Sequence, residues 1–264
     1  MKRTIIGLVV CAAVCLTAQS VHATAILIDS AGDTGTLVDT IGGNNALLFG
    51  VDGGVLKGVG NSKVFLTVNQ TGNDTTEQGY NTDGTVEFET IDSGTESLLL
   101  SDVPLVSRAG VNYYEFAFAL NQTGGSSLIS FNAIQLFQAS SGSLTGYPGF
   151  GGQATQIFNW ASNGDTLTVD DFVSGLSDAE MLMLVPQAAF GSGNYVMLYM
   201  DAGVPEEANA GNDKWLVTEN AACAELGLCE PVIPEPSTML LLGLGLGMTA
   251  VFGVARHGHR RKRG

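Results

Sequence analysis

Short apolar runs, separated by clusters of glycine, serine, threonine and asparagine, fill residues 26–222. Runs of this length are typical of strands joined by tight turns. Residues 113–120 show the clearest alternation, with Tyr114, Phe116 and Phe118 on one face of the expected strand and Glu115 on the other. Because the connections are too short for crossover helices, we expect antiparallel pairing. The sequence therefore predicts an all-β fold, an antiparallel β sandwich of jelly-roll type, as one ectodomain over residues 26–222.

About ten strands are expected. Residues 63–69 and 85–91 alternate in the same way, and residues 128–137 slip in register near Ala133, which predicts a β bulge or a strand buried on both faces. Residues 177–185 fit either a short helix or a turn followed by a strand. The remaining runs expected to form strands are residues 46–51, 98–100, 156–160, 167–169, 195–200 and 214–217.

The N-terminus has the pattern of a secretory signal peptide over residues 1–25. Lys2 and Arg3 supply positive charge, an apolar run follows over residues 5–18, and small residues end the segment. Cleavage is expected after Ala25. An uncleaved anchor is the alternative, but the apolar run is shorter than the ~20 residues that a membrane span needs.

Near the C-terminus, residues 238–255 carry no charge and are rich in leucine and glycine. A helix of this length reaches about 27 Å, so we predict one transmembrane helix. A soluble core helix is the alternative, but a β-rich domain has no place for a helix that is apolar on every face. Basic residues follow the span, and the positive-inside rule places them in the cytoplasm and the domain outside. This basic anchor consists of Arg256, Arg260, Arg261, Lys262 and Arg263.

Directly before the span lie Pro234, Glu235, Pro236 and Ser237. The prolines remove two backbone donors and push the preceding residues toward extended conformations, which would give a stiff strip that a membrane-embedded enzyme could grip. The order of this motif, an apolar span and a basic terminus resembles the PEP-CTERM sorting tail of bacteria that make extracellular polysaccharide. The resemblance covers residues 234–264.

The resemblance implies how the chain is handled. It implies recognition and removal of the tail by exosortase, a membrane cysteine protease. With the signal peptide, it also implies export through the Sec translocon, residence in the inner membrane before processing, and then a place in the cell envelope or outside the cell. Extracellular polysaccharide is the partner that the resemblance suggests for the domain.

Cys223 and Cys229 are the only cysteines expected in the mature domain. In an oxidising compartment two nearby cysteines are expected to pair, which would make residues 223–233 a disulfide loop and linker. A metal or redox pair is the alternative. The spacing is not that of a redox motif, and no histidine lies nearby to complete a metal site.

Acidic residues dominate the 209 residues from Ile26 to Pro234, with 25 carboxylates, four fixed positive charges and a formal net charge of −21. Such a field repels nucleic acid, so we expect no nucleic-acid partner. It suits solubility, divalent cations, or a neutral or cationic ligand.

The chain keeps all three histidines, His22, His257 and His259, in its terminal segments. A mature domain without histidine has no Ser-His-Asp triad, no Cys-His pair and no imidazole-bound metal. There is also no glycine-rich phosphate loop with its lysine. We therefore predict no catalytic residues, no metal and no cofactor.

Three weaker hypotheses remain. A glycosidase needs only two carboxylates, and candidate pairs of acids occur at Asp170 with Asp171 and at Glu87 with Glu89. Solvated strand faces and turns explain these pairs equally well.

A calcium site would draw on hard oxygen ligands close together in sequence, although their spacing departs from an EF-hand loop. Those candidate ligands are Asn163, Asp165, Asp170 and Asp171. Exposed rings in glycine-rich loops could bind sugars, although most rings in a sandwich belong to the core. The candidate rings are Trp160, Tyr147, Phe150 and Tyr80.

Taken together, the sequence favours an exported, non-enzymatic protein of the cell surface or extracellular matrix, sorted by its tail and associated with exopolysaccharide or biofilm. A secreted carbohydrate-binding module or glycan-active enzyme is one alternative. A membrane-anchored surface protein that is never processed is the other.

Overall fold

The computed structural model describes residues 25–51, 61–70, 74–122, 126–162, 165–172, 179–209 and 211–232. The predicted transmembrane helix, basic anchor and sorting motif lie outside these residues, as does all of the predicted signal peptide except Ala25. Within the described ranges, no helix is both long enough and apolar enough to cross a bilayer.

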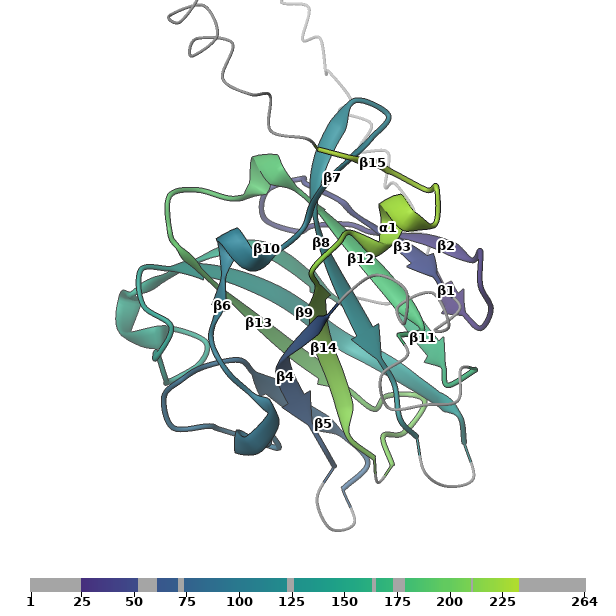
Figure 1. Ribbon diagram of the computed structural model, residues 1–264. Coiled ribbons are helices and arrows are strands. Elements are labelled where there is room, and N and C mark those ends of the chain that lie inside the picture. Colours follow the sequence, from purple (N-terminus) through teal and green to yellow (C-terminus); the bar gives the residue numbers. More distant parts are fainter. Residues whose placement is uncertain are drawn as a thin grey trace, which may run out of the picture.

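Two β-sheets pack face to face, so the predicted all-β class is confirmed (Figure 1). The first sheet, sheet A, contains β1 (Ala25–Ile28), β5 (Glu77–Tyr80), β6 (Leu98–Leu99), β9 (Leu128–Ala139), β10 (Ala154–Ala161), β11 (Thr166–Asp170) and β13 (Tyr195–Ala202). The second sheet, sheet B, contains β2 (Thr34–Leu37), β3 (Ala46–Gly50), β4 (Ser62–Val68), β7 (Leu105–Arg108), β8 (Val111–Ala119), β12 (Met181–Pro186), β14 (Asp213–Thr218) and β15 (Glu230–Pro231). Helical turns are short and comprise η2 (Asp92–Gly94), η3 (Leu100–Asp102), η4 (Phe150–Gly152), η5 (Gln187–Ala189) and α1 (Ala222–Glu225).

Strand pairing is antiparallel throughout the described ladders except between β1 and β11, which run parallel. The predicted register slip near Ala133 is confirmed as a bulge. Asp201 pairs with Ala133 and Ala202 pairs with Phe131, so β9 carries one extra residue, Asn132, against β13. Of the two alternatives for residues 177–185, the strand is confirmed from Met181, where β12 begins, while residues 177 and 178 lie outside the described residues.

One predicted strand is wrong. Residues 85–91 form no strand; they make a turn in which Phe88 has a φ of 60°, and a single bridge joins Thr90 to Val68. A positive φ breaks the extended backbone that a strand requires. The structure instead uses residues 77–80 as the strand β5, which pairs with β13.

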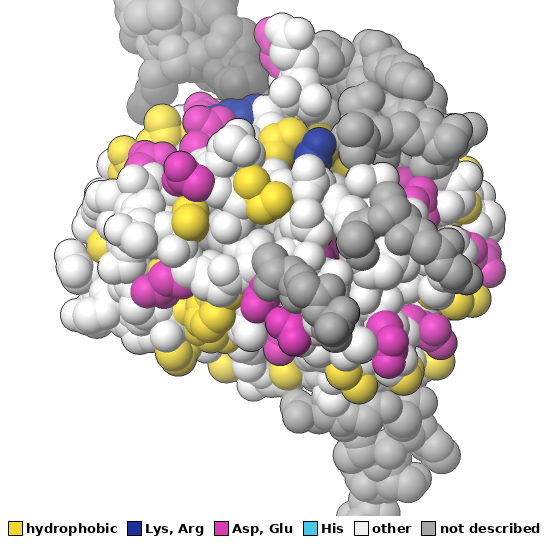
Figure 2. Space-filling view, turned by 90° about the horizontal axis from the view of Figure 1, so that it is seen from below, with side chains coloured by type: hydrophobic (Ala, Val, Ile, Leu, Met, Phe, Trp, Pro, Cys, Tyr) yellow, Lys and Arg dark blue, Asp and Glu magenta, His cyan; other side chains and the backbone are white. Residues whose placement is uncertain are grey.

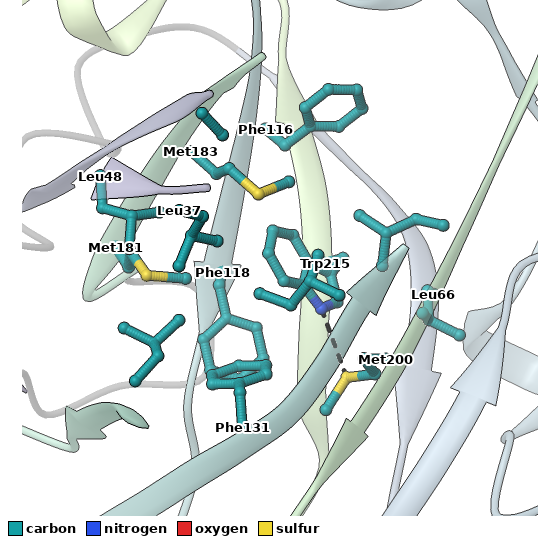
Figure 3. Close-up of a cluster of buried hydrophobic side chains, with 14 of the residues drawn as sticks. Leu37, Leu48, Leu66, Phe116, Phe118, Phe131, Met181, Met183, Met200 and Trp215 are labelled. Carbon is teal, nitrogen blue, oxygen red and sulfur yellow. Dashed lines mark hydrogen bonds between the residues drawn. The ribbon is translucent and has the colours of Figure 1, made fainter. Parts of the chain in front are cut away.

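The main core lies between the two sheets (Figure 3). Trp215 of β14 is fully buried, and its indole N–H donates to the sulfur of Met200 on β13 at 3.3 Å. The ring of Phe118 lies 5.1 Å from that of Trp215 and 5.0 Å from that of Phe131, measured between centroids. These contacts join strands of both sheets, so the alternate inward residues of each strand make one continuous core.

Two smaller clusters cover the outer faces of the sandwich. On sheet B, Leu182, Leu184 and Leu216 pack under Ala222 and Cys223. On sheet A, most of the large outward residues are aromatic, and they form the surface described next.

Candidate functional site

Six aromatic rings gather on the outer face of sheet A. Neighbouring residues along a strand point to opposite faces, so Leu136 and Leu198 enter the core whereas Phe137 and Tyr199 point outward. The loop that follows β9 and the turn after β5 bring further rings onto this face. The six rings belong to Tyr80, Phe88, Phe137, Tyr147, Phe150 and Tyr199.

Tyr147 and Tyr199 form the closest pair, stacked with centroids 3.8 Å apart and planes inclined by 12°. Phe88 packs edge-on against both rings, at 6.0 Å from Tyr147 and 6.3 Å from Tyr199. Phe88 remains 47% exposed and Tyr147 is half-buried, whereas Tyr199 is 5% exposed. The surface therefore presents the ring of Phe88 and one edge of a stack formed by Tyr147 from a loop and Tyr199 from β13.

Carboxamide side chains border these rings. The hydroxyl of Tyr147 donates to Oε1 of Gln135 at 2.7 Å, and that of Tyr199 donates to Oε1 of Gln78 at 2.9 Å. Gln135 in turn donates to Asn159 at 2.8 Å. All three amides are half-buried, so they keep water-accessible edges on the same face. We call the six rings with Gln78, Gln135 and Asn159 the aromatic–amide face.

Glu87 holds the turn that carries Phe88. Its carboxylate accepts the hydroxyl of Tyr80 at 2.5 Å and the backbone N–H of Gly146 at 3.1 Å. The hydrogen bond from Tyr80 lowers the pKa of Glu87, with a further contribution from the Gly146 N–H. Burial, followed by the bond to Glu87, raises the pKa of Tyr80. This network links the turn to the loop that carries Tyr147.

The expectation of a sugar platform made from Trp160, Tyr147, Phe150 and Tyr80 is wrong for three of the four rings. Trp160 points into the core between the sheets, and Phe150 and Tyr80 are buried members of the aromatic–amide face that present almost no surface to solvent. Two further rings of this face, Phe88 and Tyr199, could not be assigned to it from the sequence, because Phe88 was expected in a strand and the stacking partner of Tyr199 lies far away in sequence. The sequence does hold one indication that Phe88 is exposed. Its apolar ring lies between two carboxylates, Glu87 and Glu89, which favour contact with water.

Three of the four acids in the candidate pairs accept hydrogen bonds from the fold. Glu89 accepts the backbone N–H of Gln78 at 3.1 Å, while Glu87 is engaged as described above. Asp171 accepts the backbone N–H of Gln122 at 3.0 Å. These bonds tie the carboxylates to neighbouring backbone groups, which is a structural use.

The calcium hypothesis has no cluster to support it in the described part of the chain. Asn163 lies outside the described residues. Across the described ranges, no three or more His, Cys, Asp or Glu side chains are grouped so that they could hold a metal ion. Calcium binding stays a hypothesis that no grouping of ligands in the described residues supports.

Buried acids instead gather where β8 ends. Asp213 accepts the backbone N–H of Asn121 at 2.7 Å, and Glu180 accepts that of Leu120 at 2.6 Å. Burial raises the pKa of Glu180 to about 9, and burial with the charge of Asp213 raises the pKa of Glu77. Figure 2, viewed from below Figure 1, shows acidic side chains spread over the surface with little lysine or arginine among them.

The described chain ends in a segment fastened to sheet B. Cys223 and Cys229 form a disulfide whose Cα atoms are 5.3 Å apart. Glu115 of β8 accepts the backbone N–H groups of Ala222 at 2.7 Å and Cys223 at 2.8 Å. Arg108 donates to the carbonyl of Leu228, and its guanidinium carbon lies 4.7 Å from the centre of the Phe49 ring. Beyond this segment lie the residues of the predicted sorting motif.

The fold and the C-terminal sequence thus define a class of protein, in which an all-β sandwich domain precedes a C-terminal sorting motif. Residues 232–261 match the family model for the PEP-CTERM protein-sorting motif. The chain therefore carries the sorting motif of an exported, membrane-processed protein, and exosortase is the processing partner that this motif implies. No curated protein and no solved structure matches the chain.

Proposed function

We propose that this chain is a non-enzymatic protein of the cell surface or extracellular matrix, released to the envelope when exosortase removes its tail. The observation that carries the proposal is the sorting motif at residues 232–261. The disulfide supports it, because such bonds persist in oxidising compartments outside the cytoplasm. An association with exopolysaccharide or biofilm belongs to the same proposal.

The test is the intact mass and location of the protein in a polysaccharide-forming host, with and without its membrane processing enzyme. We expect the secreted form to lack the tail only when the enzyme is present. A full-length chain that stays in the inner membrane in both strains would instead support a plain anchor. The variant Glu235→Ala tests the motif itself, and we expect it to slow removal of the tail.

A second candidate function is carbohydrate binding, and the exposed ring of Phe88 on the aromatic–amide face favours it. Sugar rings stack on aromatic faces, and carboxamides donate to and accept from hydroxyl groups. The domain has little positive charge, so an anionic polymer is a poor fit and a neutral polysaccharide is the better ligand. The amide edges of Gln78, Gln135 and Asn159 lie beside the rings, where the hydroxyls of such a chain would meet them.

Affinity electrophoresis in a gel that contains a neutral soluble glucan tests this second candidate. An aromatic contact of about 1.5 kcal/mol corresponds to about tenfold in affinity, so we expect Phe88→Ala to weaken retardation by about that factor. Val111→Ala is the matched control, since Val111 is 45% exposed and lies on sheet B. Equal retardation of both variants would contradict a role for this face. Release of reducing sugar during incubation would point to the glycan-active alternative.

A further inference from the structure

The last described residues add an edge strand to sheet B. In β15, Glu230 pairs with Ser107 and Pro231 pairs with Val106 of β7. The backbone N–H of Val232 then donates to the carbonyl of Leu105 at 3.4 Å. The chain is therefore held against the domain up to the residue at which the sorting motif begins.

Three contacts fasten this segment, which we call the C-terminal brace, residues 222–232, to sheet B. They are the Glu115 carboxylate under α1, the Arg108 bond to Leu228, and the β15 ladder; the disulfide closes a loop within the brace itself. Cys223 is fully buried in the cluster on sheet B. Side-chain and backbone hydrogen bonds from β7 and β8 thus act on one short segment whose loop the disulfide closes, so it is held as part of the domain.

The brace limits how far the motif can stand from the domain. A chain extends by at most ~3.6 Å per residue, so Pro234 lies within about 7 Å of Val232. By the same limit, Thr238, the first residue of the predicted span, lies within about 22 Å of Val232. A protease that encloses Pro234 and its neighbours is wider than the short stretch of chain between Val232 and Pro234. It therefore cannot bind these residues without contacting the domain.

We infer that the brace end of the sandwich, with the β7–β8 hairpin, is the surface that docks against the membrane-embedded processing enzyme. This inference rests on the proposed function, because it assumes that the tail is processed. Figure 1 shows the β7–β8 hairpin and β15 together at the upper end of the molecule. Val111 lies at the turn of that hairpin and is 45% exposed.

The opposite end of the sandwich provides a control position. β13 runs from Tyr195, which pairs with Leu99, to Ala202, which pairs with Glu77 at the other end. Val204 follows Ala202 and is 55% exposed. A probe at this position has similar access to solvent and belongs to the end that points away from the brace.

The experiment places a photoreactive amino acid at Val111 or at Val204 of the full-length chain, co-expressed with the processing enzyme inactivated at its nucleophile. We expect the probe at Val111 to form an adduct with the enzyme and the probe at Val204 to form none. A twelve-residue Gly-Ser insertion between Val232 and Ile233 adds about 40 Å of reach and is expected to abolish the Val111 adduct.

Equal adducts from both positions would overturn the inference, as would a Val111 adduct that survives the insertion. Tail removal is scored in parallel by intact mass with the active enzyme. If the parent chain keeps its tail there, the proposed function fails; if the tail is removed but Val111 gives no adduct, only the docking surface fails.

Discussion

The carboxylate of Glu115 accepts the backbone N–H of Cys223 at 2.8 Å, across 108 positions of sequence. Glu115 belongs to the middle of β8, and Cys223 belongs to the short helix after the last long strand. One buried carboxylate thus satisfies the donors at the start of α1, which have no partner within the helix. The contact explains how a four-residue helix persists at the surface of a β-sheet.

Removing the Glu115 carboxylate is expected to destabilise the domain and loosen the brace. A buried donor left without an acceptor costs about 1–3 kcal/mol, so Glu115→Ala should lower the free energy of unfolding by about 2 kcal/mol or more. Urea denaturation measures the change. Glu225→Ala is the control, because Glu225 is exposed in the same helix, and we expect a change of less than about 0.5 kcal/mol.

The stability of the domain is expected to fall as the pH rises from 5 to 9. Burial raises the pKa of Glu115 to about 7 and that of Glu180 to about 9. Both carboxyls are protonated in the folded state at a pH where the unfolded chain, with a glutamate pKa of about 4.3, has released its protons. The folded state therefore binds more protons than the unfolded state, and stability declines as pH increases.

Thermal unfolding at pH 5, 7 and 9 measures this dependence. The contribution of Glu115 is complete below about pH 4.3 and is lost as the pH rises through 7, and that of Glu180 is lost as the pH rises through 9. We expect Glu180→Gln to flatten the decline between pH 7 and 9. A Tm that increases across this range in the parent protein would contradict the assignment.

Much of the fold could be predicted because strong alternation survives in the longest strands. Residues 113–120 and 63–69 match β8 and β4, and the slip near Ala133 matches the bulge in β9. The strand β5 was missed because the sequence Glu77–Tyr80 has little apolar character, and its partner β13 lies over a hundred residues away. Local pattern carries no information about such pairing.

The residues of the candidate site were less predictable than the strands. Membership of the site depends on whether each ring points to the core or to the outer face of its sheet. Trp160 and Tyr147 both follow glycine-rich stretches, yet only Tyr147 reaches the outer face. The alternation at Glu87, Phe88 and Glu89 resembles a strand but comes from a turn that Tyr80 and Gly146 hold through Glu87. Sequence alone does not distinguish these origins.

Reduction of the disulfide is expected to affect the brace before the sandwich. Cys223 and Cys229 are six positions apart, and the chain-entropy relation gives about 2 kcal/mol for so short a loop. We expect amide exchange with a reducing agent to accelerate in α1 and β15, with little change in β9 and β13. Uniform acceleration across both sheets would show instead that the bond stabilises the whole domain.

The contact of Trp215 with Met200 offers a test of how the two sheets are held together. Trp215 packs against Phe118 and Phe131, so Trp215→Ala should lower the free energy of unfolding by about 3–5 kcal/mol. Met200→Leu keeps most of the volume and removes the sulfur acceptor, so its cost should stay below about 1.5 kcal/mol. Both variants are compared by urea denaturation. If Met200→Leu costs as much as Trp215→Ala, then the N–H···S hydrogen bond, rather than ring packing, dominates this part of the core.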